Sequence, residues 1–377
     1  MTLIYLVAGE QSGDVLGARL MTALRARRPG VEFAGIGGTQ MTMQGLASRF
    51  PISELAVMGL LEVLPRLAQL RRRLAETVAD IAARRPVVVV TIDSPGFTLR
   101  LLRAVASLGV RRVHYVAPQI WAWREGRVRH YPGLWDRLLC LLPFEPEFFA
   151  RHDLPAQFVG HPVLESGADR GDGARFRTQH GLSGAARVIT VMPGSRRNET
   201  SRLLPILGAT LQLLGDIVPV VPIAGPVAEA VRAGTRSWPV PPILVTEDGE
   251  KHDAFAASSA ALTKSGTATL ELALADVPML VAYRVNPLSG VLIRRLVKVQ
   301  YASLLNLLSG HELVPELMQE ACTPARLAEV LTRLLDDPDA AAAQRLGFRA
   351  VLQALRPTFG LPSEAAANSV LELLDQS

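Results

Sequence analysis

Short apolar runs alternate with amphipathic stretches along most of the chain, and this alternation pauses near the middle and then starts again. Strands buried on both faces of a parallel sheet are continuously apolar, and the stretches between them, such as 66–85 and 202–214, have helical periodicity. This pattern predicts two consecutive doubly wound α/β domains. The predicted strands are 3–7, 87–92, 111–116, 137–142 and 157–159, then 188–192, 218–224, 243–245, 260–263 and 279–282.

A length of 377 residues also fits two domains. The polar, glycine-rich stretch 165–186 is the best candidate for a linker. We therefore expect one Rossmann-like domain over 1–165 and a second over 186–345, with helices in 346–377 that pack back on the first domain or on the partner chain of a homodimer. In such sheets the ligand lies outside the carboxyl ends of the strands, so we expect a cleft between the two domains.

Composition excludes several classes of protein. The 49% of hydrophobic residues fits a globular core, and the two cysteines exclude a disulfide scaffold or a cysteine-rich metal site. The net charge of +5 comes almost entirely from arginine, which favours anionic substrates or an anionic membrane surface over nucleic acid. We expect no signal peptide, because the N-terminus lacks a basic segment, and no membrane-spanning helix, because no apolar run reaches about 18 residues.

Familiar cofactor and metal motifs are incomplete. Gln40 stands where a dinucleotide fingerprint needs its third glycine, and there is no complete phosphate-binding P-loop. The one D-x-D triplet, Asp337 to Asp339, lies between helical segments and is better read as a turn and helix cap. We therefore expect neither a cofactor nor a metal.

Two carboxylates follow predicted strands of the first domain. Glu10 lies in the loop Ala8–Asp14, and a plain turn capped by Asp14 has no need of it. Asp93 ends the most hydrophobic run of this domain, where a carboxylate can act as a general base towards a hydroxyl. The alternative for Asp93 is a cap on the following helix.

An aromatic loop follows the predicted strand 111–116. Trp121, Trp123 and Arg124 lie in it, and such side chains can stack on a sugar or hold a phosphate. The alternative is a packed loop with arginines that reach the solvent. The lone histidines His114 and His161 are more often core or loop residues than catalytic ones.

Two loops of the second domain have the composition of anion sites. Glycines and hydroxyl residues at a helix start expose backbone N–H groups to a phosphate, and an arginine neutralises it. The alternatives are an ordinary helix entry for the first loop and a capping box for the second, which leucine at position 270 weakens. The candidate residues are Gly194, Ser195 and Arg196 in the first loop and Ser265, Gly266, Thr267 and Glu271 in the second.

Together these blocks resemble the lipid-A-disaccharide synthase family, which are glycosyltransferases of the GT-B fold. The resemblance spans nearly the whole chain, and the set is far more specific than any one block. It is carried by residues 8–20, 35–41, 55–64, 92–97, 114–123, 141–149, 158–162, 193–199, 265–274, 278–284 and 301–308.

The resemblance implies a reaction. UDP-2,3-diacylglucosamine would be joined to 2,3-diacylglucosamine 1-phosphate (lipid X), giving a β-1′,6-linked lipid A disaccharide 1-phosphate and UDP with inversion at the anomeric carbon. Enzymes of this fold generally work without a bound metal. Asp93 would be the base, and Glu10 a second candidate base or an acceptor anchor. UDP would be held by the seven candidates of the second domain, and Asn306 is a further candidate for the nucleotide site.

Acylated substrates would explain the apolar stretch 55–61, which includes Val57 and Met58. It is either ordinary core or a patch that meets acyl chains and the bilayer. With Trp121, Trp123 and Arg124 it would contact the acceptor or the membrane. The resemblance thus implies a cytoplasmic protein held peripherally on the inner membrane.

Two rival functions remain open from the sequence. One is another UDP-sugar transferase or an epimerase of the same fold. The other is a nucleotide- or lipid-binding protein without catalysis, which the presence of both Asp93 and the Arg196 loop disfavours.

Overall fold

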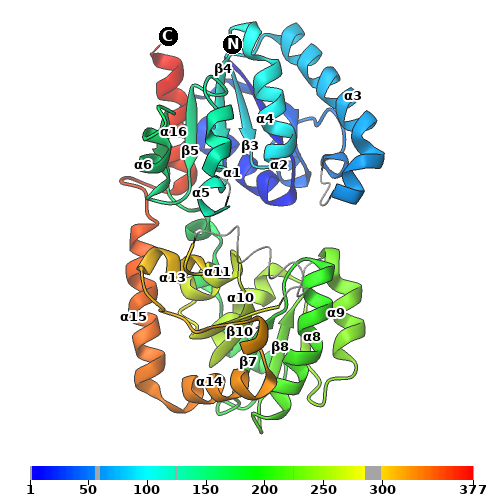
Figure 1. The fold of residues 1–377 in the computed structure, drawn as a ribbon, viewed down its shortest axis with the longest axis vertical. Coiled ribbons are helices and arrows are strands. Elements are labelled where there is room, and N and C mark those ends of the chain that lie inside the picture. Colours follow the sequence, from blue (N-terminus) through cyan, green and yellow to red (C-terminus); the bar gives the residue numbers. More distant parts are fainter. Residues whose placement is uncertain (1, 56–59, 124, 224, 285–298, 377) are drawn as a thin grey trace. The chain divides into compact units, whose positions relative to one another are not determined.

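The chain folds into two compact units, each built on a six-stranded parallel sheet (Figure 1). The computed structural model describes residues 2–55, 60–123, 125–223, 225–284 and 299–376. Unit 1 comprises Met1–Pro162 and Leu355–Ser377, and unit 2 comprises Val163–Ala354.

Unit 1 has the strand order β2-β1-β3-β4-β5-β6. The chain runs outward from β1 to β2 and then returns to the other side of β1 with β3, so its direction across the sheet reverses between β1 and β3. The strands are β1 Thr2–Ala8, β2 Val31–Ile36, β3 Val88–Ile92, β4 Arg111–Tyr115, β5 Arg137–Cys140 and β6 Ala156–Phe158. The α-helices are α1 Gln11–Arg27, α2 Thr39–Met43, α3 Leu60–Arg84, α4 Pro95–Ala104, α5 Ile120–Trp123, α6 Glu145–Ala150 and α16 Pro362–Asp375, and the 3₁₀ turns are 52–54, 106–108 and 125–130.

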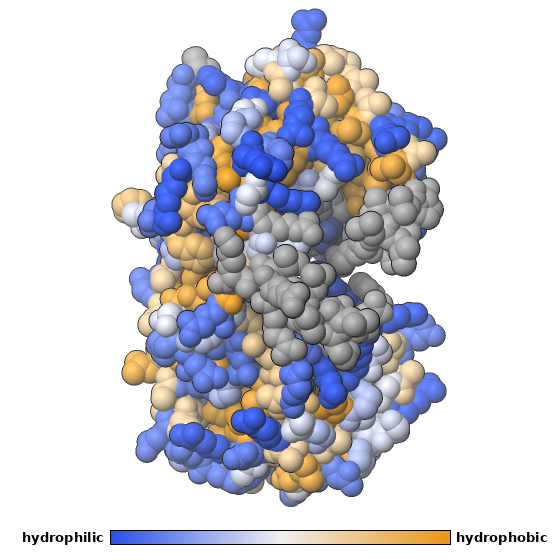
Figure 2. Space-filling model, viewed as in Figure 1, coloured by the Kyte–Doolittle hydropathy of each residue, from blue (hydrophilic) through white to orange (hydrophobic). Residues whose placement is uncertain are grey.

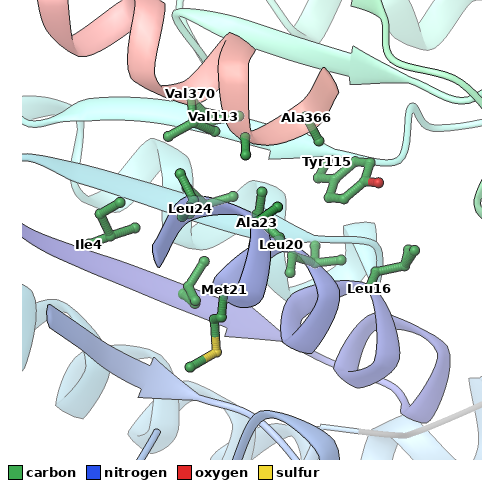
Figure 3. Packing of buried hydrophobic residues seen from close by; sticks show 14 of the residues in the cluster. Ile4, Leu16, Leu20, Met21, Ala23, Leu24, Val113, Tyr115, Ala366 and Val370 are labelled. Atoms are coloured by element: carbon green, nitrogen blue, oxygen red, sulfur yellow. The ribbon is translucent and has the colours of Figure 1, made fainter. Parts of the chain in front are cut away.

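The C-terminal helix α16 is part of the core of unit 1. It packs against α1, and its Ala366 and Val370 lie in one cluster with Leu20 and Leu24 of α1 and Val113 of β4 (Figure 3). Burying each large aliphatic side chain contributes about 1.5–3 kcal/mol, so this contact fixes α16 on the sheet.

Unit 2 has the strand order β12-β11-β10-β7-β8-β9, with the reversal between β7 and β10. The strands are β7 Val188–Met192, β8 Val218–Pro222, β9 Ile243–Val245, β10 Ala260–Lys264, β11 Met279–Tyr283 and β12 Glu316–Met318. The α-helices are α7 Gly173–Gln179, α8 Arg197–Gln212, α9 Ala228–Thr235, α10 Asp248–Ala257, α11 Ala268–Leu274, α13 Leu304–Ser309, α14 Pro324–Asp336 and α15 Pro338–Ala354, and the 3₁₀ turns are 162–165, 168–170, 225–227 and 319–321.

The predicted linker 165–186 is not a linker. Asp253 on α10 accepts hydrogen bonds from the backbone N–H of Asp172 at 2.7 Å and from the Arg175 guanidinium at 2.6 Å. These bonds fasten α7 to α10, so unit 2 begins at Val163 rather than at 186. It ends at Ala354 rather than at 345, because α15 belongs to it.

Among the described residues, no helix combines the length and the apolar character needed to cross a bilayer.

Candidate functional site

The loops after β1 and β3 lie side by side at the reversal point of unit 1. The register pairs Ala8 with Ile92, so the segment that begins at Gly9 runs beside Asp93 and Ser94. A Cβ at position 9 would collide with the Ser94 side chain, which explains why glycine stands there. The structure therefore brings Glu10 and Asp93 to one edge of the sheet, where doubly wound folds bind their ligands.

Asp93 is held in an unusual backbone conformation. Its φ is 52° and that of Ser94 is 47°, both in the left-handed region that only glycine adopts freely. Three hydrogen bonds fix this turn. The N–H of Asp93 donates to the Tyr115 carbonyl at 2.9 Å, Oδ1 of Asp93 accepts the Ser94 N–H at 2.7 Å, and the Thr98 hydroxyl donates to the Asp93 carbonyl at 2.7 Å. Such strain concentrates at functional sites.

The Asp93 carboxyl is half-buried, and burial raises its pKa above the ordinary 3.8, although the Ser94 N–H opposes this shift. A raised pKa means a stronger hold on a proton, which a general base needs. The upward shift of the Asp93 pKa therefore suits the role of general base that the sequence predicts.

The carboxylates Glu10 and Asp14 differ in what they do. Glu10 occupies the N-cap position of α1 but makes no capping hydrogen bond there. Asp14 is buried and accepts the backbone N–H groups of Gly38, Gln40 and Met41 at 2.7–3.0 Å. Asp14 thus caps α2. The alternative from the sequence, in which Asp14 caps the helix that follows its own loop, is wrong.

A pocket of about 380 Å³ lies at the reversal point of unit 2. The ends of β7, β8, β9 and β10 contribute to it. Six of the predicted UDP-binding residues line it: Gly194, Ser195, Ser265, Gly266 and Thr267 from the loops, and Glu271 from α11. Gly194 has a φ of 108°, which glycine adopts freely, and a Cβ at Gly266 would meet no atom within 4 Å, so the backbone at Gly266 is open to a ligand.

Two lysines that the sequence analysis did not single out also line this pocket. Lys251 Nζ lies 3.2 Å from Asp248 and 3.3 Å from Glu271, and Lys264 Nζ lies 3.1 Å from Glu199. Burial alone would lower the pKa of Lys251, but these two carboxylates more than offset it and raise the pKa above 10.5. A signal was available, because the chain contains only three lysines among its 40 basic residues.

Arg196 is not among the residues that line the pocket. It is the N-cap residue of α8, its side chain is 61% exposed, and its guanidinium lies 3.6 Å from Glu199. The Ser265 hydroxyl donates to the Ala302 carbonyl at 2.6 Å, which leaves it only as an acceptor for a ligand.

Asn306 has a different role from the predicted contact with the nucleotide. Its side chain is fully buried, and its amide donates to the Val314 carbonyl and to Glu316, both at 2.8 Å. Its amide oxygen accepts two further backbone N–H groups, so all of its usual hydrogen-bonding positions are filled. Asn306 instead orders the loop that Glu316 holds at Ala302, next to Ser265.

The aromatic loop lies in unit 1, at α5. Trp121 donates to the buried Glu145 at 3.1 Å and packs edge-on against Phe144, whereas Trp123 is 41% exposed. Burial raises the pKa of Glu145 to about 7, against the lowering effect of three N–H donors. The predicted contact residues Val57, Met58 and Arg124 lie outside the described residues.

Other candidates have structural roles. His114 is fully buried between Thr91 and Trp135, and burial lowers its pKa to about 3. His161 is buried too. Asp337 caps α15 by accepting the N–H groups of Asp339 and Ala340, as the sequence indicates. Within the described ranges, no group of three or more His, Cys, Asp or Glu side chains is arranged to hold a metal ion.

The comparisons with known proteins agree with one another. The family model described as lipid-A-disaccharide synthetase matches residues 4–370. The chain belongs to the lipid-A-disaccharide synthase family. A family member from Granulibacter bethesdensis is 58% identical, with 99% of both chains covered, and one from Pseudomonas aeruginosa is 44% identical, with 99% of this chain and 98% of the relative covered.

Solved structures that resemble this family member show the fold. An S. aureus MnaA–UDP co-structure has a TM-score of 0.67 at 14% identity, covering 100% of this chain and 98% of the other. MurG from Acinetobacter baumannii has a TM-score of 0.56 at 13% identity, with both chains fully covered at 100%. The architecture is that of the GT-B glycosyltransferases and epimerases, as the sequence predicts.

Proposed function

We propose that this protein transfers the sugar of UDP-2,3-diacylglucosamine to the 6-hydroxyl of 2,3-diacylglucosamine 1-phosphate, as the inverting glycosyltransferase of lipid A disaccharide synthesis. The observation that carries this proposal is the position of Asp93. In a chain whose family is established over 4–370, a carboxylate with a raised pKa stands at the reversal point of a doubly wound sheet.

The proposed reaction is a single displacement. Asp93 accepts the proton of the acceptor 6-hydroxyl while the oxygen of that hydroxyl bonds to the anomeric carbon of the donor. The bond from that carbon to the UDP oxygen breaks on the opposite face, so the configuration inverts. The carboxylate ends protonated and UDP leaves with the bonding electrons. Glu10, at the same edge, is the second candidate for the base or an anchor for the acceptor.

The pocket of unit 2 supplies what a diphosphate leaving group needs. Backbone N–H groups at Gly194, Ser195, Gly266 and Thr267 are available to its oxygens, and the Lys264 ammonium lies beside them. Arg196 adds positive charge next to Ser195. Glu271, held by Lys251, is placed to accept hydrogen bonds from the ribose hydroxyls. These roles extend those predicted from sequence.

Acylated substrates also support a place at the membrane surface. We infer peripheral attachment to the cytoplasmic face of the inner membrane, through the acyl chains and through arginines that meet anionic headgroups. The face drawn in Figure 2 exposes hydrophobic side chains on unit 1 in the area where Figure 1 places α3 and α4.

The test is to incubate the purified protein with both substrates in detergent and EDTA and to follow products by mass spectrometry. We expect equal amounts of the acylated disaccharide 1-phosphate and UDP, with EDTA causing no loss. UDP-N-acetylglucosamine without acyl chains serves as the control donor. Conversion of that control to an epimer, or UDP binding without any product, would replace the proposal by one of the two rival functions.

A further inference from the structure

A cavity of unit 1 adjoins the Asp93 turn. It has a volume of about 450 Å³ and lies between α4 and the segment that runs from Pro118 through α5 to Leu134. Its floor is apolar, with Ile120, Tyr131 and Leu134 each at most 7% exposed. Three arginines also line it, at positions 100, 103 and 127.

The charge of this cavity is unbalanced. None of the residues that line it, all of them described, is acidic. Arg103 donates to the His130 carbonyl at 2.9 Å and is thereby fixed in place. Arg100 and Arg127 are exposed and have no acidic side chain within 4.0 Å among the described residues. Two unpaired guanidinium groups at one cavity favour a doubly charged anion such as a phosphomonoester.

The cavity also offers an apolar surface that reaches the solvent. Trp123 lines it and is 41% exposed, which is unusual for so large a hydrophobic side chain. The helix that carries it is anchored from beneath by the hydrogen bond of Trp121 to the buried Glu145. An exposed indole beside a buried apolar floor suits an acyl chain, so the cavity as a whole suits an anionic amphiphile.

The cavity is placed correctly for the acceptor of the proposed reaction. Pro95 and Gly96 line it, and they follow Asp93 and Ser94 at the start of α4. A sugar whose phosphate lies in the cavity therefore has its ring close to the Asp93 turn.

We propose that this cavity binds the phosphorylated acceptor, with Arg100 and Arg127 on its 1-phosphate and one acyl chain along Ile120 and Trp123. This assignment rests on the proposed function for the identity of the ligand. Arg127 follows the aromatic loop, whose arginines the sequence already makes candidates for holding a phosphate, so the structure adds Arg100 and the cavity itself.

The test compares acceptors with and without the phosphate. A short-chain 2,3-diacylglucosamine 1-phosphate and its phosphate-free analogue are titrated calorimetrically, without donor, into the wild type, the double variant Arg100→Gln/Arg127→Gln, and the control Arg151→Gln. Arg151 is an exposed arginine of unit 1 that does not line the cavity and pairs with Glu147. UDP affinity is measured for each protein to show that unit 2 is intact, and the urea unfolding of unit 1 is followed to show that this unit is folded as well.

In the wild type and in the control, we expect removal of the phosphate to weaken binding by on the order of 10- to 100-fold, as for hydrogen bonds to a charged group. The double variant should bind both acceptors with one and the same affinity, lower than that of the wild type for the phosphorylated acceptor. Its UDP affinity should be unchanged. A double variant that still distinguishes the two acceptors as the wild type does would overturn the assignment.

Two further outcomes are distinguishable. If the double variant keeps its acceptor affinity but no longer sediments with phosphatidylglycerol vesicles, the arginines serve lipid headgroups and the acceptor assignment is wrong. If the wild type binds the phosphorylated acceptor through these arginines but forms no disaccharide when donor is added, the cavity stands and the proposed function fails.

Discussion

Asp93 is the side chain on which the proposed chemistry depends. Its backbone is left-handed, its neighbour Ser94 is as well, and its carboxyl is removed from full hydration. The last of these properties raises its pKa. A base of this kind is inactive when protonated, so its pKa must be visible in the rate.

The pH dependence of kcat/KM should therefore show an acidic limb. Activity should fall as pH is lowered through the pKa of Asp93, and the midpoint should lie above 3.8, the ordinary value for aspartate. UDP binding measured at the same pH values is the control, because unit 2 should still bind UDP there. A midpoint at or below 3.8, with UDP binding intact, would show that the base is a carboxyl whose pKa burial does not raise.

Substitution of Arg196 tests the proposed site of the UDP leaving group. Its side chain is 61% exposed, so we expect Arg196→Ala to weaken UDP binding by about 1.5 kcal/mol, the lower end for a hydrogen bond to a charged group and about tenfold in Kd. Arg202→Ala, an exposed residue on the same helix α8, should leave the Kd unchanged. Equal Kd values for the two variants, measured by calorimetry, would remove Arg196 from the site.

The helix α6 shows how one element positions another. Its Glu145 accepts the N–H groups of Leu141 and Leu142 at the end of β5 and that of the Trp121 indole on α5. Glu145 is 2% exposed. One buried carboxyl thus joins β5, α6 and the aromatic loop, and its protonation must affect the stability of unit 1.

Glu145 should make unit 1 less stable as pH rises. Its pKa is about 7 when folded and near 4.5 when unfolded, so the folded state binds the extra proton between these values. The free energy of unfolding should fall by up to about 3 kcal/mol from pH 4.5 to above 7. In Glu145→Gln this contribution should vanish, as measured by urea unfolding of unit 1 at pH 5 and 8. An unchanged difference between the two pH values in the variant would contradict the assignment.

The sequence predicts these elements well where burial controls the pattern. The central strands are continuous apolar runs, and β7 and β9 begin and end at the predicted residues. The edge strands β2 and β12 were missed, because Val31–Ile36 includes a charged residue and Glu316–Met318 is very short. The stretch 165–186 looked like a linker because its ordering depends on Asp253, about eighty residues away.

Some residues of the candidate site could also be predicted from the sequence and others could not. Loops after strands and at helix starts could be found from the sequence, and those around Asp93, Gly194 and Ser265 do lie at the reversal points. The ion pairs of the pocket lysines and the saturated amide of Asn306 could not be predicted, because they depend on tertiary contacts such as Lys251 with Glu271 and Asn306 with Glu316.

As a whole, the molecule pairs two units of the same architecture with a net charge of +5, almost all of it from arginine. A net positive charge draws a protein to an anionic membrane surface, so the proposed peripheral attachment has an electrostatic part. Exposed charges are screened within about 10 Å at 0.1 M salt.

Binding to vesicles should therefore depend on salt. We expect cosedimentation with vesicles that contain phosphatidylglycerol to fall when NaCl is raised from about 50 to about 500 mM, and to be weak with phosphatidylcholine alone at either concentration. Binding that is insensitive to both salt and lipid charge would indicate attachment by apolar contacts alone.

The central claim is that Asp93 deprotonates the acceptor in a transfer from UDP-2,3-diacylglucosamine, and the turnover of Asp93→Asn tests it most directly. Asparagine keeps the shape of the side chain but cannot take the proton. We expect a fall in kcat of about 10²- to 10⁴-fold, with donor and UDP affinity largely kept. Glu10→Gln, assayed beside it, should lose less. Near-normal turnover of Asp93→Asn, or a larger loss in Glu10→Gln, would contradict the account and move the base to Glu10 or elsewhere.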